Sequence, residues 1–158
     1  STGIYGNPDR EVVTAETVPE ANGVRGERLA VIERSWLSGG EQFQVLRLAG
    51  IYGPERIIGQ RALMHGEAIG GKPEAWLNLI HAEDAATLSM KCLGAGAAKI
   101  ELGTDGNPVR RKDYYNYVAG LLGYPPAQFS DEASQQESKY PIRTSNGKKC
   151  LIQGQRTR

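Results

Sequence analysis

One stretch near the middle of the chain, FQVLRLAGIYGP, restricts the fold more than any other. Residues 45–49 form a nearly continuous apolar run, and a glycine-rich turn follows them. A strand with one face in water alternates apolar and polar residues, whereas a strand covered on both faces is apolar almost throughout. The run therefore predicts a central strand of a parallel sheet over residues 44–49.

Helical and extended segments alternate around this strand. Apolar residues at helical spacing predict helices over residues 26–37, 57–66, 83–93 and 112–122. Their expected inner faces carry Leu29, Ile32 and Trp36 in the first, Ala85, Leu88 and Cys92 in the third, and Tyr114, Tyr117, Val118, Leu121 and Leu122 in the last. Residues 1–6 are typical of a strand end that enters a turn. Alternation of this kind indicates an α/β layer with parallel pairing.

Composition excludes several classes of protein. The 158 residues include 19 basic and 18 acidic side chains, a balance that argues against electrostatic binding to nucleic acid or to a membrane. No apolar run approaches the length of a membrane span. Cys92 and Cys150 lack metal-ligand spacing, so we expect reduced thiols, a cytoplasmic protein and no metal site.

A nucleotide-binding parallel sheet usually begins with a strand, a GxGxxG turn and a helix. The glycine pairs at residues 39–40 and 70–71 do not fit that pattern. The phosphate-binding loop is therefore absent from this sequence.

Four stretches, taken in order, resemble one family. They are STGIYG, VLRLAGIYGP, NLIHAEDAA and DGNPVRRKDYYNYVAGLLG. Together they are similar to the C-terminal half of an extended short-chain dehydrogenase/reductase, the group of NAD-dependent epimerases/dehydratases. The resemblance implies the C-terminal part of a Rossmann-like NAD(P)-binding sheet with a small substrate-binding lobe over residues 1–125, then a polar, weakly structured tail over residues 126–158. It also implies that the chain is a fragment whose parent binds NAD or NADP.

Members of this family use a Tyr-x-x-x-Lys pair, in which the tyrosine is a general acid/base and the lysine lowers its pKa. The corresponding stretch here is ANGVRGERLAVIER, which places either Arg25 and Leu29 or Val24 and Arg28 at the two positions. The chain thus resembles an atypical branch that keeps the fold without the pair.

The resemblance also implies a set of site residues. Those expected are Ser1 and Tyr5 as catalytic residues, Thr2, Arg28, Gly50 and Ile51 against the cofactor, and Tyr52, Asn78 and His81 against the substrate.

Several of these residues have a simpler interpretation. Arg28 suits a solvated helix face, Ser1 a strand-end hydroxyl, and Tyr5 and Tyr52 aromatics packed beside turns. His81 suits a structural histidine, although with Tyr52 it is the first candidate for a replacement acid/base.

Four charged residues outside this set also receive predictions. Asp84 is expected to face the positive end of a helix dipole, and Arg47 to anchor an internal ion pair. For Arg110 and Arg111 a solvated face is expected, with a substrate phosphate contact as the alternative.

Three functions stay open at this stage. The first is an NAD(P)-dependent enzyme acting on a sugar or a nucleotide-linked small molecule. The second is a non-catalytic NAD(P)-binding sensor or scaffold. The third is an isolated fragment without cofactor affinity. A homodimer packed near Trp36 is an additional expectation, and the choice of substrate and of NAD over NADP is left open.

Overall fold

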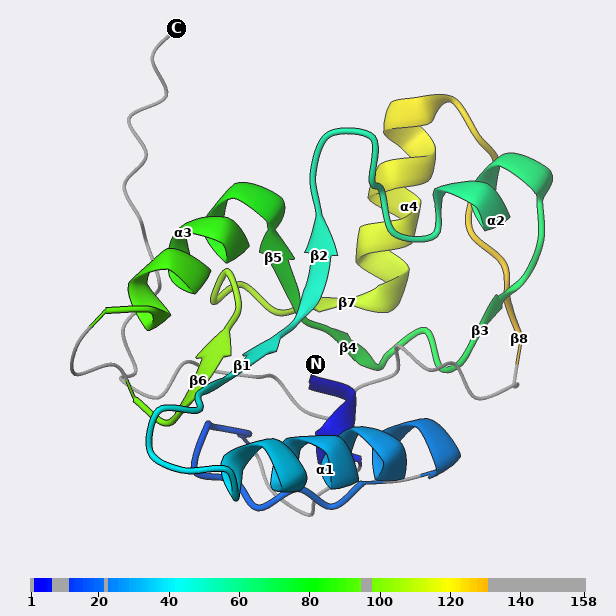
Figure 1. Ribbon diagram of the computed structural model, residues 1–158. Helices are drawn as coiled ribbons and strands as arrows, with labels where there is room; N and C mark the ends of the chain where they lie inside the picture. Colours follow the sequence, from blue (N-terminus) through cyan, green and yellow to red (C-terminus); the bar gives the residue numbers. More distant parts are fainter. Residues whose placement is uncertain (1, 7–11, 22, 95–97, 131–158) are drawn as a thin grey trace, which may run out of the picture.

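The computed structural model describes residues 2–6, 12–21, 23–94 and 98–130 (Figure 1). In chain order the elements are η1 (Thr2–Tyr5), α1 (Gly23–Leu37), β1 (Val45–Leu48), β2 (Gly50–Tyr52), α2 (Gln60–His65), β3 (Ile69–Gly70), β4 (Trp76–Leu77), β5 (Leu79–His81), α3 (Ala82–Cys92), β6 (Ile100–Gly103), β7 (Val109–Arg110), α4 (Arg111–Leu122) and β8 (Phe129–Ser130). The helices predicted over residues 26–37, 57–66, 83–93 and 112–122 correspond to α1, α2, α3 and α4.

Parallel pairing confirms the α/β class. Strand β1 pairs with β6, with Val45 opposite Ile100, and β2 pairs with β5, with Gly50 opposite Leu79. Strands β3 and β8 are also parallel, whereas β4 and β7 are antiparallel. Within the described part of the chain β1 has one strand neighbour, so the predicted central position is not seen there.

The two faces of β1 are covered by different helices. Leu46 and Leu48 pack with Ala85 and Leu88 of α3, as predicted for the inner face of that helix. Arg47, on the opposite face, reaches Glu33 of α1. Figure 1 accordingly shows α3 and α1 on opposite sides of the β1–β6 pair. Neighbouring side chains of a strand point to opposite faces, so the sequence VLRL directs its leucines at positions 46 and 48 toward α3 and its arginine toward α1.

A second cluster of buried residues lies between α2 and α4. Leu63 of α2 packs with Tyr115, Val118 and Ala119 of α4, and Phe129 of β8 lies against them. Gly59 adopts a φ of 79°, and a Cβ there would lie 2.3 Å from the ring of Tyr115, so glycine is required for both reasons.

Two predicted helix faces are wrong in part. Ile32 and Trp36 of α1 are 64% and 52% exposed, and Tyr117 and Leu121 of α4 are 68% and 67% exposed. The buried residues of α4 are Arg111, Tyr115, Val118 and Ala119, of which Val118 was predicted. These residues also have helical spacing. Because Arg111 is charged, a search for apolar residues alone does not include it and predicts a different buried face for α4.

The beginning of the chain also differs from expectation. Residues 2–5 form a 3₁₀ turn, where a strand end was predicted, and Ser1 lies outside the described residues. No described helix is both apolar enough and long enough to cross a bilayer.

Candidate functional site

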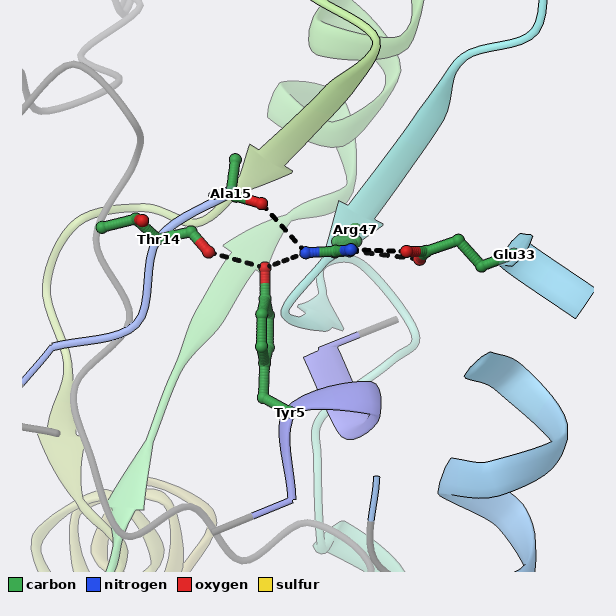
Figure 2. A network of polar contacts seen from close by, with 5 residues as sticks. All are labelled: Tyr5, Thr14, Ala15, Glu33 and Arg47. Atoms are coloured by element: carbon green, nitrogen blue, oxygen red, sulfur yellow. Dashed lines mark hydrogen bonds and ion pairs between the residues drawn. The ribbon is translucent and has the colours of Figure 1, made fainter. Parts of the chain in front are cut away.

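Tyr5, a candidate catalytic residue, lies in a buried network around Arg47 (Figure 2). Its hydroxyl donates to the carbonyl of Thr14 at 2.9 Å and accepts from Arg47 Nη1 at 2.7 Å. Arg47 also donates to the Ala15 carbonyl at 3.1 Å, and its Nε and Nη2 both bond to the Glu33 carboxylate. This pairing confirms the prediction that Arg47 anchors an internal ion pair.

Burial decides the protonation of this tyrosine. Tyr5 is 3% exposed, and burial raises the pKa of its hydroxyl, an effect that the Arg47 guanidinium offsets only in part. A general base needs a pKa near the working pH and access to the substrate. The environment of Tyr5 therefore suits a structural role, and its predicted catalytic role stays a prediction.

Four of the other predicted site residues lie together on β2 and β5, and a fifth, Asn78, immediately precedes β5. The register places Tyr52 opposite His81, Ile51 opposite Ile80 and Gly50 opposite Leu79, and Leu79 is the residue that follows Asn78. The Gly50 amide donates to the Asn78 carbonyl at 3.0 Å. Ligands of open α/β sheets bind outside the carboxyl ends of the strands, where Tyr52 and His81 lie.

The rings of Tyr52 and His81 are in contact. Their centroids are 5.3 Å apart in an edge-to-face arrangement. His81 caps α3, since its Nδ1 accepts the amide of Glu83 at 3.3 Å. A neutral imidazole whose Nδ1 accepts a hydrogen bond carries its proton on Nε2, which leaves Nε2–H as a donor. His81 is thus a structural cap, and its Nε2–H can donate to another group. Glu83 and Asp84 lie in the first turn of α3, as predicted for Asp84.

Space around this pair depends on Gly53. A Cβ at that position would lie 3.5 Å from His81 Nε2 and 3.2 Å from the Cβ of Ala82. A glycine therefore keeps the approach to Nε2 clear. The side chain of His81 is 28% exposed, so a small molecule can reach it.

Tyr114 on α4 is a candidate that the sequence did not single out for the site. It accepts a hydrogen bond from the backbone of Ile58 and lies within electrostatic range of Tyr52. Burial raises the pKa of Tyr114, and the nearby Tyr115 and Tyr52 hydroxyls add to the rise. The sequence showed this tyrosine only as part of an apolar helix face.

The remaining candidates lie apart from this cluster. Thr2 is in η1, and Arg28 is exposed on α1 beside Val24, Val31 and Ile32, which line a hollow of about 430 Å³. α1 contributes none of the clustered residues.

The prediction of a solvated face at the start of α4 is wrong for Arg111. This residue is fully buried, its Nη2 donates to the Gly70 carbonyl at 2.7 Å, and its guanidinium lies 5.3 Å from the ring centroid of Tyr115. Arg110 instead stacks on Trp76 at 3.8 Å. The alternative phosphate contact stays a prediction.

The described residues contain no glycine-rich phosphate cradle. A Cβ on Gly50 would meet Ile58 at 3.0 Å and Leu79 at 3.2 Å, so that side of the glycine faces the core, and its predicted cofactor contact stays a prediction. None of the described helices begins with a glycine-rich phosphate loop. No group of three or more His, Cys, Asp or Glu side chains in the described ranges could hold a metal ion.

Comparisons with known proteins found one kind of curated relative and several similar solved structures. No family model matches the chain. Protein YeeZ of Escherichia coli K12 is 31% identical over 144 residues, which are 88% of this chain and 50% of YeeZ. The chain thus spans about half the length of the curated relatives it matches.

Solved structures give the same proportion. MoeE5 in complex with UDP-glucose and NAD superposes with a TM-score of 0.75 and 18% identity, over 93% of this chain and 55% of MoeE5. The dTDP-glucose 4,6-dehydratase of Bacillus anthracis in complex with NAD superposes with a TM-score of 0.73 and 15% identity. The match covers 93% of this chain and 52% of the dehydratase. By fold the chain resembles the NAD-dependent epimerases/dehydratases, and it spans about half the length of the solved structures it matches.

Proposed function

We propose that this chain is the substrate-side part of an NAD(P)-dependent epimerase/dehydratase-like protein that acts on a sugar or a nucleotide-linked small molecule. The observation that carries the proposal is the contact between Tyr52 and His81 at the carboxyl ends of two paired parallel strands. The sugar-nucleotide ligands of MoeE5 support the substrate class.

In this proposal His81 and Tyr52 act on a hydroxyl or carbonyl group of the substrate. The Nε2–H of His81 donates a hydrogen bond to the substrate oxygen, and the Tyr52 hydroxyl orients it from the neighbouring strand. Tyr114 forms the adjacent wall. NAD(P) would supply the hydride chemistry, and the predicted contacts of Thr2, Arg28, Gly50 and Ile51 with it stay predictions.

The test uses the longer protein in which this sequence occurs, with a panel of sugar nucleotides and NAD or NADP. Turnover should fall about 100-fold or more in His81→Gln or Tyr52→Phe, the usual effect of losing a positioned acid/base. The matched control is His65→Gln, at the exposed end of α2, which should leave turnover unchanged. Turnover that survives both site substitutions and collapses in Tyr5→Phe would contradict the proposal.

A non-catalytic NAD(P)-binding sensor or scaffold is the alternative. It is favoured by the Tyr5 hydroxyl, which is bound to Arg47 and Thr14 inside the protein, and by the lack of Tyr-x-x-x-Lys. Cofactor binding without turnover on any substrate in the panel would support it. A homodimer formed through the side of α1 that carries Trp36 is also proposed, since that side chain is 52% exposed.

A further inference from the structure

The turn that follows β2 is held in an unfavourable backbone conformation. Gly53 and Arg56 form two mutual backbone hydrogen bonds, of 3.1 and 3.0 Å, which close a tight turn through Pro54 and Glu55. Glu55 has a φ of 62° and is the one non-glycine residue with a positive φ among the described residues. A turn with proline in its second position and a positive φ in its third normally has glycine there, because a Cβ disfavours this region. Other contacts must therefore hold the turn.

Two side chains anchor this turn, one from within the segment and one from α4. Arg56 Nε donates to the Ile51 carbonyl of β2 at 2.9 Å. Two residues after the turn, the amide of Ile58 donates to the hydroxyl oxygen of Tyr114 on α4. Ile58 is 7% exposed within the cluster between α2 and α4, so its amide needs an acceptor inside the protein. In Figure 1 the segment passes from the end of β2 along α4 to α2, as this bond requires.

The same turn borders the imidazole of His81. A Cβ on Gly53 would lie 3.5 Å from His81 Nε2, so the backbone of the turn forms part of the approach to that nitrogen. The other ring nitrogen, Nδ1, is bonded to the amide of Glu83 on α3 and has no contact with the turn. A displacement of the turn would therefore narrow the space over Nε2 and leave the cap of α3 intact.

We propose that Tyr114 is a positioning residue, which holds the Gly53–Arg56 turn against its local preference and so keeps His81 Nε2 open to the substrate. Tyr114 acts through the backbone in this role and does not touch the reacting group. The use of His81 in the reaction rests on the proposed function, whereas the hold on the turn does not. Glu55→Gly removes the unfavourable Cβ, so it should also remove the need for the anchor.

Amide hydrogen exchange of this chain tests the hold on the turn. The Arg56 amide is the reporter, because it bonds to the Gly53 carbonyl and not to Tyr114. In Tyr114→Phe it should exchange at least about fivefold faster, the usual effect of one lost hydrogen bond on a local opening. Tyr117→Phe, on the same helix with its side chain 68% exposed, is the matched control and should leave the rate unchanged. Adding Glu55→Gly to Tyr114→Phe should restore the slow rate.

Solvent access to His81 tests the consequence for the site. Hydroxyl-radical oxidation, read by mass spectrometry, is compared at His81 and at His65, the two histidines of the chain. The ratio of oxidation at His81 to that at His65 should fall by about half or more in Tyr114→Phe, and recover when Glu55→Gly is added. An unchanged Arg56 rate or an unchanged ratio in Tyr114→Phe would overturn the proposal.

Kinetics of the longer protein separate this role from the proposed function. Tyr114→Phe should lower kcat about fivefold with KM and the pH profile unchanged, because only access to the reacting nitrogen is altered. A shifted pH profile would make Tyr114 an acid/base and contradict the positioning role. If the unsubstituted protein shows no turnover on the panel, the proposed function fails, while exchange at Arg56 and oxidation at His81 still decide the role of Tyr114.

Discussion

Replacing Glu33 by glutamine should destabilise the protein far more than a similar change at the surface. The carboxylate of Glu33 is the one acidic partner of Arg47 among the described residues, and their side chains are 12% and 2% exposed. Glutamine keeps the shape of the side chain but removes its charge. Arg47 would then be a buried cation with only neutral acceptors around it: the glutamine amide oxygen, the Tyr5 hydroxyl and the Ala15 carbonyl.

The magnitude follows from the burial of the guanidinium. Removing one partner of a buried ion pair costs about 3–5 kcal/mol, because the other charge stays desolvated without compensation. Glu33 is slightly open to water, so we expect the lower end, about 3 kcal/mol. With a urea m-value of about 2 kcal/mol/M, the unfolding midpoint should fall by about 1.5 M.

The assay is urea unfolding at pH 7, followed by circular dichroism. Glu41→Gln is the matched control, since Glu41 pairs with Lys99 at 2.9 Å but its side chain is 93% exposed. An exposed pair contributes at most about 1 kcal/mol, or about 0.5 M in midpoint. Equal shifts for Glu33→Gln and Glu41→Gln would refute the reasoning. The double variant Glu33→Leu/Arg47→Met should regain most of the stability, because apolar replacements of a buried pair are often neutral.

Three further predictions concern stability and cofactor binding. Burial raises the pKa of Tyr5, so the folded state keeps this proton while the unfolded chain loses it above about pH 10. The free energy of unfolding should therefore fall above that pH, and it should fall less steeply in Tyr5→Phe. Urea midpoints at about pH 8 and about pH 10.5 measure the difference. Burial, with a smaller effect of Asp84, raises the pKa of Asp105, so the folded state holds this proton more tightly than the unfolded chain does and stability is lost as pH rises through the carboxyl range. Asp105→Asn should raise the urea midpoint at pH 7 and leave it unchanged at pH 3. Calorimetry should detect no micromolar binding of NAD or NADP to this chain alone, and such binding would contradict the missing phosphate loop.

Local patterns predicted the elements well because they depend on nearby residues. Helices α1, α3 and α4 and strand β1 follow from the spacing of apolar side chains and from the glycines that end the helices. The pairing of Arg47 was also predictable, since an arginine within an apolar strand requires a buried partner.

The candidate site was only partly predictable. Tyr52 and His81 were named separately, and the parallel register of β2 and β5 is what brings their rings together. Tyr114 was missed because its approach to Tyr52 depends on how α4 packs against the segment that contains Ile58. No sequence pattern carries that information.

The sequence by itself determined the α/β class, the order of the four α-helices around strand β1 and the absence of a phosphate loop, because spacing and glycine positions are local properties of the chain. Only the tertiary structure decided which sides of α1 and α4 are buried. Tyr117 and Leu121 lie in water while Arg111 lies inside, because the facing strand offers the Gly70 carbonyl and the Tyr115 ring stacks nearby. The buried face of a helix is set by the partner it packs against, and that partner is distant in the sequence.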